Sequence, residues 1–272
     1  KSDESKKLFI DCLKNNTANP YFELSDQFTT QTYGSYCGPT NIFILLNTIG
    51  IDPKEPFFLK WRYYYENNIH HLDIDGMKHH GMVITDLKYL LEANGVKCKL
   101  YRPICENTQM FPTSLNIDLL NDEHKYKDLL VYDDMKTFKS STLKENVFKK
   151  LCDNKKTKFI FNLVNADFLK SCIYASTFYN NFFMVLNIHR TSLGQEGGGH
   201  YMPVAAYEQK TDNVLLLDCA RFKYDSRWHK FDMVFNYITG VDRVTNNSRG
   251  FVVAEKKIEK KINIITNSDI KE

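Results

Sequence analysis

The stretch QTYGSYCGPTNIFILLNTIGID places one cysteine, Cys37, directly before Gly-Pro and an apolar run. Pro39 suits the first turn of a helix, and Gly50 falls where a helix commonly ends. The pattern predicts a buried helix over 37–49 whose N-terminal N–H groups and dipole favour a thiolate at Cys37. Gln31 lies close enough upstream to return its amide toward the sulfur. A nucleophile and a small core residue both stay open here, because free cysteine is often buried.

A cysteine nucleophile needs a base and a group that orients the base. His200 follows the glycine-rich turn GQEGGG and opens the apolar run HYMPVAAYE, whereas Asp218 closes the next apolar run, VLLLD. In a hairpin the end of the second strand lies beside the start of the first. A carboxylate at that position can hold the imidazole in one tautomer. The spacing alone leaves a second interpretation open, in which His200 is a surface residue and Asp218 belongs to a turn.

Two other segments contain residue types found in binding sites. NNIHHLDIDGMKHHG carries four histidines and two aspartates, but adjacent histidines point in different directions and no HExxH spacing is present. We interpret it as a solvated loop and predict no metal ligands. GQEGGG lacks the Lys-Ser/Thr of a phosphate-binding loop, so we interpret it as a turn that allows close backbone approach to a ligand.

Composition excludes several classes of protein. The 272 residues are 43% hydrophobic and 14% aromatic, which is enough for a sizeable core. The net charge of +3 is not gathered into a stripe, so we expect no nucleic acid partner. No apolar run approaches the roughly 20 residues of a membrane span. Seven cysteines without a CxxC pair argue against a zinc ribbon or a disulfide framework and favour a reducing, cytoplasmic location. Because the chain starts at Lys1, an upstream signal peptide stays open.

Hydrophobic periodicity predicts an α+β protein, and the length of the chain fits either one large domain over 1–272 or two small ones. We expect helices near 5–15, 37–49 and 141–154, and a further helix within 81–101 that is capped by Thr85, is followed by Gly95 and leads into a strand. The remaining apolar runs predict strands: KFIFNLV, FFMVLNIHR, HYMPVAAYE, VLLLDCA and RGFVVAE. We expect insertions at about 103–140 and 166–181 and a C-terminal tail at about 256–272.

Taken together, these residues resemble one known family. The order Gln31…Cys37-Gly…Gly-His200…Leu-Asp218-Cys-Ala-Arg-Phe-Lys-Tyr…Trp…Arg249-Gly-Phe is similar to that of phytochelatin synthases, which are papain-like cysteine transferases acting on glutathione. The stretch HYMPVAAYEQKTDNVLLLDCARFKYDSRW resembles the most characteristic part of the family, and the match covers most of 30–255. The resemblance implies a papain-like fold, in which a helical part carries the nucleophile and packs on an antiparallel sheet that carries the histidine and aspartate.

The resemblance also assigns roles to single residues. Cys37 would be the nucleophile, His200 the general base and acid, and Asp218 the residue that orients His200. Gln31 would form the oxyanion hole together with the backbone N–H of Cys37. The implied substrate-binding residues, of which an arginine would hold a glutathione carboxylate, are Arg249, Arg221, Arg190, Gly199 and Tyr224.

The implied reaction transfers γ-Glu-Cys from glutathione, through a thioester on Cys37, to a second glutathione or a phytochelatin. No bound cofactor is implied; Cd²⁺ or Zn²⁺ would act as a thiolate complex of the substrate. A homodimer stays open. The sequence departs from the family at Pro39-Thr40, at HHLDID, where plant enzymes carry a cysteine pair, and in having no Cys-rich extension of the plant kind. The last two departures favour hydrolysis. A glutathione hydrolase and a non-catalytic metal- or thiol-binding module are therefore the alternatives.

Overall fold

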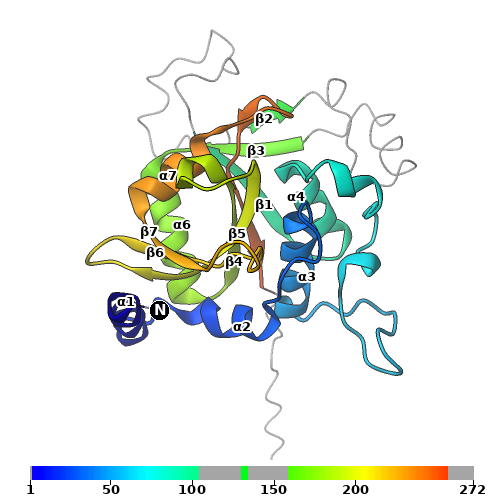
Figure 1. Cartoon of the computed structure of the whole chain (residues 1–272), viewed down its shortest axis with the longest axis horizontal. Coiled ribbons are helices and arrows are strands. Elements are labelled where there is room, and N and C mark those ends of the chain that lie inside the picture. Colours follow the sequence, from blue (N-terminus) through cyan, green and yellow to red (C-terminus); the bar gives the residue numbers. More distant parts are fainter. Residues whose placement is uncertain (1, 104–129, 134–158, 257–272) are drawn as a thin grey trace, which may run out of the picture.

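The computed structural model describes residues 2–103, 130–133 and 159–256 (Figure 1). Eight strands in this part of the chain form one sheet: β1 (Cys98–Pro103), β2 (Leu130–Asp133), β3 (Phe159–Val164), β4 (Phe182–His189), β5 (Gly199–Glu208), β6 (Asn213–Leu216), β7 (Arg227–Lys230) and β10 (Phe251–Glu255). Their spatial order is β2-β3-β1-β10-β4-β5-β6-β7. We predicted an antiparallel sheet, and this is wrong for one pair: β1 and β3 run parallel. A parallel pair needs a long connection, which residues 104–158 supply.

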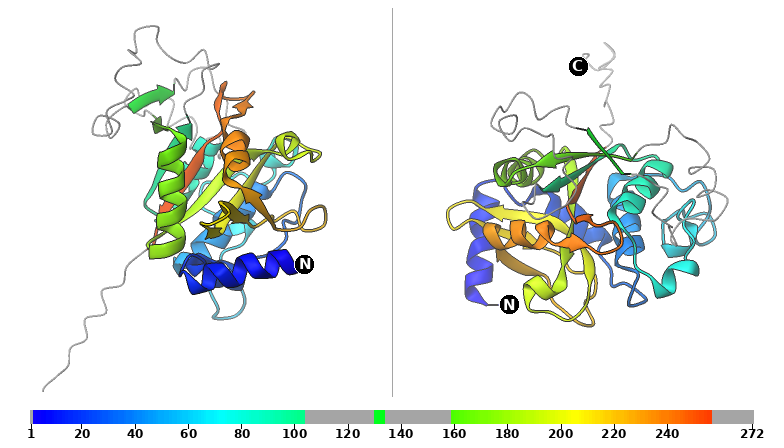
Figure 2. Two further views of the ribbon diagram at one scale, coloured as in Figure 1. Left: turned by 90° about the vertical axis from the view of Figure 1, so that its left-hand side faces the viewer. Right: turned by 90° about the horizontal axis from the view of Figure 1, so that it is seen from above.

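Helices cover both faces of the sheet. The first four are α1 (Asp3–Lys14), α2 (Asn19–Gln27), α3 (Cys37–Ile49) and α4 (Ile84–Ala93); α6 (Ala166–Tyr179) and α7 (Phe231–Thr239) follow. Figures 1 and 2 show α3 and α4 on one side of the central strands, and α6 and α7 on the other. Successive side chains of β4 point to opposite faces of the sheet, and each face has its own hydrophobic core. Phe183 and Val185 pack with the first group of helices, whereas Met184 and Leu186 pack with the second.

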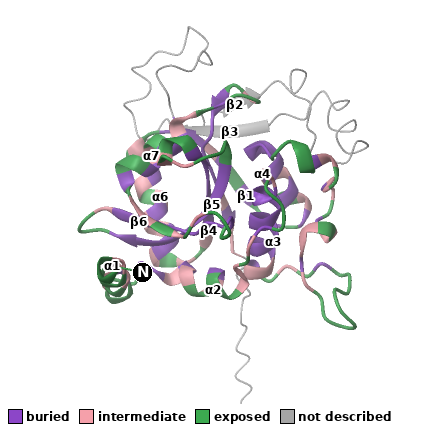
Figure 3. Ribbon diagram, in the orientation of Figure 1, coloured by how far each residue is buried: buried purple, intermediate pink, exposed green. Residues whose placement is uncertain are grey.

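Helix α3, which begins at Cys37, is buried along most of its length (Figure 3). Its residues from Ile42 to Leu46 are apolar on every side because the helix lies between α2, α4 and β5. Gly50 ends it in a left-handed conformation with φ 78°, which glycine adopts without strain. The predicted helix over 37–49 is confirmed, including its terminal glycine.

Most other predicted elements are confirmed. The expected helix near 5–15 is α1, and the predicted strands correspond to β1, β3, β4, β5, β6 and β10. The capping role of Thr85 is wrong: α4 begins at Ile84, and its N-cap, Val83, makes no side-chain cap bond. Gly95 follows the helix with φ 91°, as expected. No helix in the described ranges is both long and apolar enough to cross a membrane.

The segments predicted as insertions differ in what the structure says of them. Residues 166–179 form α6, whose Leu169 and Ile173 lie in the second core. This segment is therefore part of the packed fold, and its status as an insertion stays a prediction. The predicted insertion at 103–140 lies outside the described residues except for its first residue and β2. The predicted helix 141–154 and nearly all of the tail 256–272 also lie outside them.

Candidate active site

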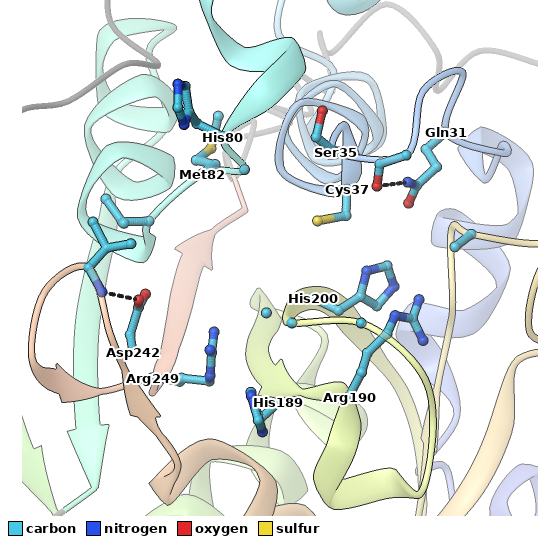
Figure 4. A pocket seen from close by; sticks show the side chains of 18 of the residues that line it. Gln31, Ser35, Cys37, His80, Met82, His189, Arg190, His200, Asp242 and Arg249 are labelled. Carbon is cyan, nitrogen blue, oxygen red and sulfur yellow. Dashed lines mark hydrogen bonds between the residues drawn. The ribbon is translucent and has the colours of Figure 1, made fainter.

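Cys37 and His200 meet where helix α3 packs on the sheet. Cys37 is the first residue of α3, and His200 is the second residue of β5. The side chain of Asn41, one turn into the helix, donates from Nδ2 to the carbonyl of Cys37 at 2.8 Å and to that of Tyr201 at 3.1 Å. The Asn41 amide therefore links the N-terminus of α3, where Cys37 lies, to β5, which carries His200. Figure 4 shows the Cys37 side chain directed into a cleft with the His200 ring beneath it.

His200 is held by Asp218, which lies just after the end of β6, the strand that pairs with β5. Its Nε2 lies 2.7 Å from Asp218 Oδ1, and both side chains are buried. This contact leaves Nδ1 as the ring nitrogen available to Cys37. Burial alone would lower the pKa of His200, but its bonds to Asp218, Cys219 and Cys37 raise that pKa well above the usual value. The hairpin geometry predicted for the His200–Asp218 pair is present.

The thiol of Cys37 is acidic, unlike the other cysteines that the structure describes. Burial acts to raise its pKa, but the hydrogen bond and charge of His200, with smaller contributions from Tyr201 and Arg190, lower it. Burial instead raises the pKa of Cys12 to about 11 and that of Cys98 to about 12. The lowered pKa of Cys37 and the raised pKa of His200 both favour a thiolate beside an imidazolium, which is the reactive form of a cysteine nucleophile.

Asp218 is in turn held by Arg190. The two terminal nitrogens of the guanidinium lie 2.9 and 3.0 Å from the two carboxylate oxygens, and the N–H of Ala220 donates to Oδ1 at 2.9 Å. Burial opposes ionisation, but the bonds to His200 and Arg190 lower the pKa of Asp218 to about 2. The ring of Tyr224 lies 4.8 Å from the Arg190 guanidinium. These contacts point to a positioning role for Arg190 and Tyr224; a direct role in substrate binding stays a prediction.

Gln31 lines the same cleft as Cys37, but its amide bonds to neighbours other than the Cys37 sulfur. Its backbone N–H donates to the carbonyl of Cys219 at 2.9 Å, and its Nε2 donates to the carbonyls of Tyr33 at 2.8 Å and Gly34 at 3.0 Å. Gln31 and Cys37 both line the cleft. A share in the oxyanion hole stays a prediction.

The cleft has a volume of about 1140 Å³ and extends from Cys37 to Arg249. Arg249 is buried, and its Nη1 donates to Asn187 Oδ1 at 3.2 Å while its Nε has no hydrogen-bond partner among the described residues. Gly199 lies directly against it, since a Cβ at position 199 would overlap Arg249 Nη1. Gly199 and Arg249 thus lie together in the lining of the cleft, and their part in substrate binding stays a prediction. Arg221 is exposed and is not among the cleft-lining residues.

Two buried carboxylates in the cleft, Asp242 and Asp86, were not predicted from the sequence. Asp242 belongs to β8 (Val241–Asp242), which pairs with β9 (Asn247–Ser248) directly before Arg249. Strands of two residues show no periodicity, so the sequence gives no sign of this hairpin. Asp86 is in the first turn of α4, where acidic residues are common because they stabilise the helix dipole. Its position in the sequence therefore does not indicate a binding site.

The histidine-rich segment does not form a ligand cluster. Among the described residues, the one group of three or more potential metal ligands that converges is His200, Asp218 and Cys219. Two of these already bond to each other, so we assign no metal to them. His71, from the segment, contacts the hydroxyl of Tyr89 with Nδ1 at 2.9 Å.

Comparison with known proteins agrees with this arrangement. Residues 1–251 match the sequence model described as phytochelatin synthase. Glutathione gamma-glutamylcysteinyltransferase 3 of Lotus japonicus is 22% identical over 94% of this chain and 41% of its own length. Glutathione gamma-glutamylcysteinyltransferase 2 of Arabidopsis thaliana is 23% identical over 94% of this chain and 44% of its own length. The Schizosaccharomyces pombe enzyme of the same name is 22% identical over 93% of this chain and 48% of its own length.

The chain therefore spans less than half the length of these curated relatives. The matched region includes the described helix that carries Cys37 and the strands that position His200 and Asp218. Since the family model covers most of the sequence, the chain belongs to the phytochelatin synthase family.

Proposed function

We propose that this protein transfers γ-Glu-Cys from glutathione to a second glutathione, or to a growing phytochelatin, through a thioester on Cys37. The observation that carries the proposal is the acidic Cys37 thiol beside a His200 that Asp218 holds by its other nitrogen. The relatives that match this chain are named glutathione gamma-glutamylcysteinyltransferases, and their name supports the same reaction here.

We also propose that the fold is papain-like. A nucleophile at the N-terminus of a buried helix faces a histidine and an aspartate on consecutive antiparallel strands. This division between a helical layer and a sheet layer supports the assignment.

In the first half-reaction, the Cys37 thiolate attacks the carbonyl carbon of the Cys–Gly amide of glutathione. The carbonyl oxygen becomes an oxyanion, which the Cys37 N–H would stabilise. Gln31 would join the oxyanion hole by turning one Nε2 proton from the carbonyl of Tyr33 or Gly34 to the oxyanion. When the carbon–nitrogen bond breaks, His200 gives its Nδ1 proton to the departing glycine nitrogen. A γ-Glu-Cys thioester remains on the enzyme, and His200 is left neutral with Asp218 accepting from its Nε2.

Arg249 and Asp242 suit the γ-glutamyl end of that acyl group. An amino acid has one carboxylate and one ammonium on the same carbon, so its recognition needs one cation and one anion close together. Arg249 and Asp242 are both buried, both line the cleft and are linked by the short β8–β9 hairpin. We assign the substrate carboxylate to Arg249, whose guanidinium can bind two oxygens, and the ammonium to Asp242.

In the second half-reaction, the α-amine of another glutathione attacks the thioester. Neutral His200 takes the amine proton, the carbon–sulfur bond breaks and Cys37 returns to a thiolate. At about 1140 Å³ the cleft exceeds the size of a typical small-molecule pocket, so it can hold a second peptide. Soft metal ions would enter as thiolate complexes of the substrates. If water attacks instead of the amine, the protein is a glutathione hydrolase.

The proposal is tested by incubating the protein with glutathione, with and without Cd²⁺ or Zn²⁺, and analysing products and intact protein by mass spectrometry. The expected products are glycine and (γ-Glu-Cys)2-Gly, with a γ-Glu-Cys adduct on Cys37. Cys37→Ser should lose both product and adduct, and Cys98→Val, a buried cysteine far from the cleft, should keep both.

Other outcomes identify the alternatives. Glycine with free γ-Glu-Cys alone would show a hydrolase. An unchanged rate in Cys37→Ser would contradict the mechanism. Metal binding without turnover, unaffected by Cys37→Ser, would identify a non-catalytic binding module.

A further inference from the structure

Cys219 is a second buried thiol next to the reacting residues, and no step of the proposed mechanism uses it. It directly follows Asp218 and is fully buried. Its Sγ donates to Gln31 Oε1 at 3.3 Å and accepts from Asn41 Nδ2 at 3.4 Å. Asn41 is the residue that joins α3 to β5. Cys219 therefore contacts two side chains that hold the segment around Cys37, and its Sγ also lies within 4.8 Å of a ring nitrogen of His200.

The hydrogen bonds of Gln31 fix the direction of its amide. Its Nε2 end faces the carbonyl oxygens of Tyr33 and Gly34, which can only accept, so this end must be the nitrogen. The opposite end is then Oε1, which can also only accept, and it needs a donor. The thiol of Cys219 supplies that donor, and it does so only as S–H. Burial, with the charges of Cys37 and Asp218, raises the pKa of Cys219, although the hydrogen bond and charge of His200 act to lower it, so the net shift favours the S–H form.

A backbone bond adds a second point of attachment. The N–H of Gln31 donates to the carbonyl of Cys219 at 2.9 Å. Cys219 therefore holds Gln31 by main chain and by side chain together, and Gln31 in turn holds the turn at Tyr33 and Gly34 that leads to Cys37. The N–H of Cys37, which is the second expected oxyanion donor, lies at the end of this turn.

We propose that Cys219 is a positioning residue for acylation: its S–H orients the Gln31 amide and, through it, the turn that presents the Cys37 N–H to the developing oxyanion. This inference rests on the proposed function. It assigns opposite tasks to two buried cysteines, since Cys37 reacts as a thiolate and Cys219 acts as a hydrogen-bond donor. A misplaced oxyanion site slows attack on a carbonyl without making Cys37 a weaker nucleophile.

The test compares two reactions of Cys37 in the full chain. Acylation by glutathione passes through an oxyanion, whereas alkylation by iodoacetamide is a displacement at carbon that forms none. In Cys219→Val and Cys219→Ala we expect the acylation rate to fall about tenfold or more, because the amide loses its donor. The rate of Cys37 alkylation should change less than about threefold. Cys219→Ser, which keeps a donor, should recover most of the acylation rate, and Cys98→Val should behave as the wild type.

A double-mutant cycle with Gln31→Ala tests the route of the effect. If Cys219 acts through Gln31, adding Cys219→Ala to Gln31→Ala should slow acylation no further. An additional loss of the same size in that background would overturn the inference, as would equal losses of acylation and alkylation, which would place the effect on His200. Melting temperatures identify variants that fail to fold. If Cys219→Val does not fold, the comparison uses Cys219→Ala, which adds no atoms to the core.

The wild-type measurement separates the two proposals. If the wild type acylates and Cys219→Ala and Cys219→Val acylate equally fast, only the role of Cys219 is wrong. If the wild type forms no adduct with glutathione, the proposed function fails and this inference fails with it.

Discussion

The chemistry of Cys37 depends on charges supplied by several neighbours. Burial by itself would keep the thiol protonated, and it does so at Cys12 and Cys98. At Cys37 burial is the largest single contribution, but the hydrogen bond and charge of His200, together with Tyr201 and Arg190, outweigh it and lower the pKa. Asp218 in turn accepts from the other ring nitrogen of His200 and helps to raise the pKa of His200. A change at any of these side chains should therefore appear as a change in the protonation of Cys37.

The pH dependence of alkylation measures this coupling. The pKa of Cys37 is lowered and that of His200 is raised. The thiolate–imidazolium pair should therefore be the main protonation state at pH values between these two pKa values. We expect the rate at which iodoacetamide alkylates Cys37 to reach half its maximum at a lower pH than for an ordinary cysteine, whose pKa is about 8.5. The rate should fall as the pH drops through the lowered pKa of Cys37. His200→Ala should move this profile above the ordinary range, since burial then acts unopposed; a wild-type midpoint near 8.5 would contradict the pair.

Arg190 is expected to matter for both stability and rate. It makes a two-point contact with Asp218, and both side chains are buried. Arg190→Ala would break a buried ion pair and leave Asp218 Oδ2 without this charged partner, a kind of loss that costs about 3–5 kcal/mol of unfolding free energy. Arg190→Lys should recover only part of this, because one ammonium cannot match two oxygens. Urea denaturation measures the stability, and the acylation rate should fall in the same order. A substrate-binding role without positioning would instead raise KM and leave stability unchanged.

The elements that position these residues were predictable to different degrees. Helix α3 and the β5–β6 hairpin follow from apolar runs bounded by turn residues, and these runs determine the positions of Cys37, His200 and Asp218. The pairing of Arg190 with Asp218 was not predictable, since Arg190 follows β4, Asp218 follows β6, and nothing local to an arginine selects its carboxylate. The β8–β9 hairpin was missed because two-residue strands carry no periodic signal.

Gly250 follows Arg249 directly, and its backbone conformation helps to hold Arg249 in the cleft. It has φ 82° and lies so close to the Tyr101 carbonyl that a Cβ would overlap the oxygen. We expect Gly250→Ala to lower the unfolding free energy by about 1–3 kcal/mol or more and to raise KM for glutathione, because Arg249 must move with its neighbour.

Gly50→Ala is the matched control for this prediction. Gly50 also has a positive φ, 78°, but a Cβ there would meet nothing within 4 Å. It should lose about 1 kcal/mol of stability, through backbone strain alone, and keep the wild-type KM. Thermal or urea unfolding together with steady-state kinetics distinguishes the two variants. An unchanged KM in Gly250→Ala would contradict the link to Arg249.

At the scale of the whole molecule, the net charge of +3 is small, but basic side chains line the cleft. Lys223 and Arg243 lie at the surface of the cleft, where salt screens charges beyond about 8 Å at physiological ionic strength. Glutathione has a net negative charge near neutral pH. We expect its KM to rise a few-fold as NaCl increases from about 0.02 to about 0.5 M, with kcat little changed. Arg243→Gln should weaken this salt dependence. A KM that is insensitive to salt would show that the buried Arg249 alone determines recognition.

The reactive pair also spans the two layers of the molecule, and this has a consequence for biosynthesis. Cys37 leaves the ribosome long before His200 and Asp218 are translated. Until β5 and β6 exist and dock against α3 through Asn41, the emerging polypeptide carries a thiol no more acidic than that of free glutathione. The added acidity of Cys37 therefore arises only when both layers have folded, so the unfinished polypeptide carries a thiol of ordinary reactivity.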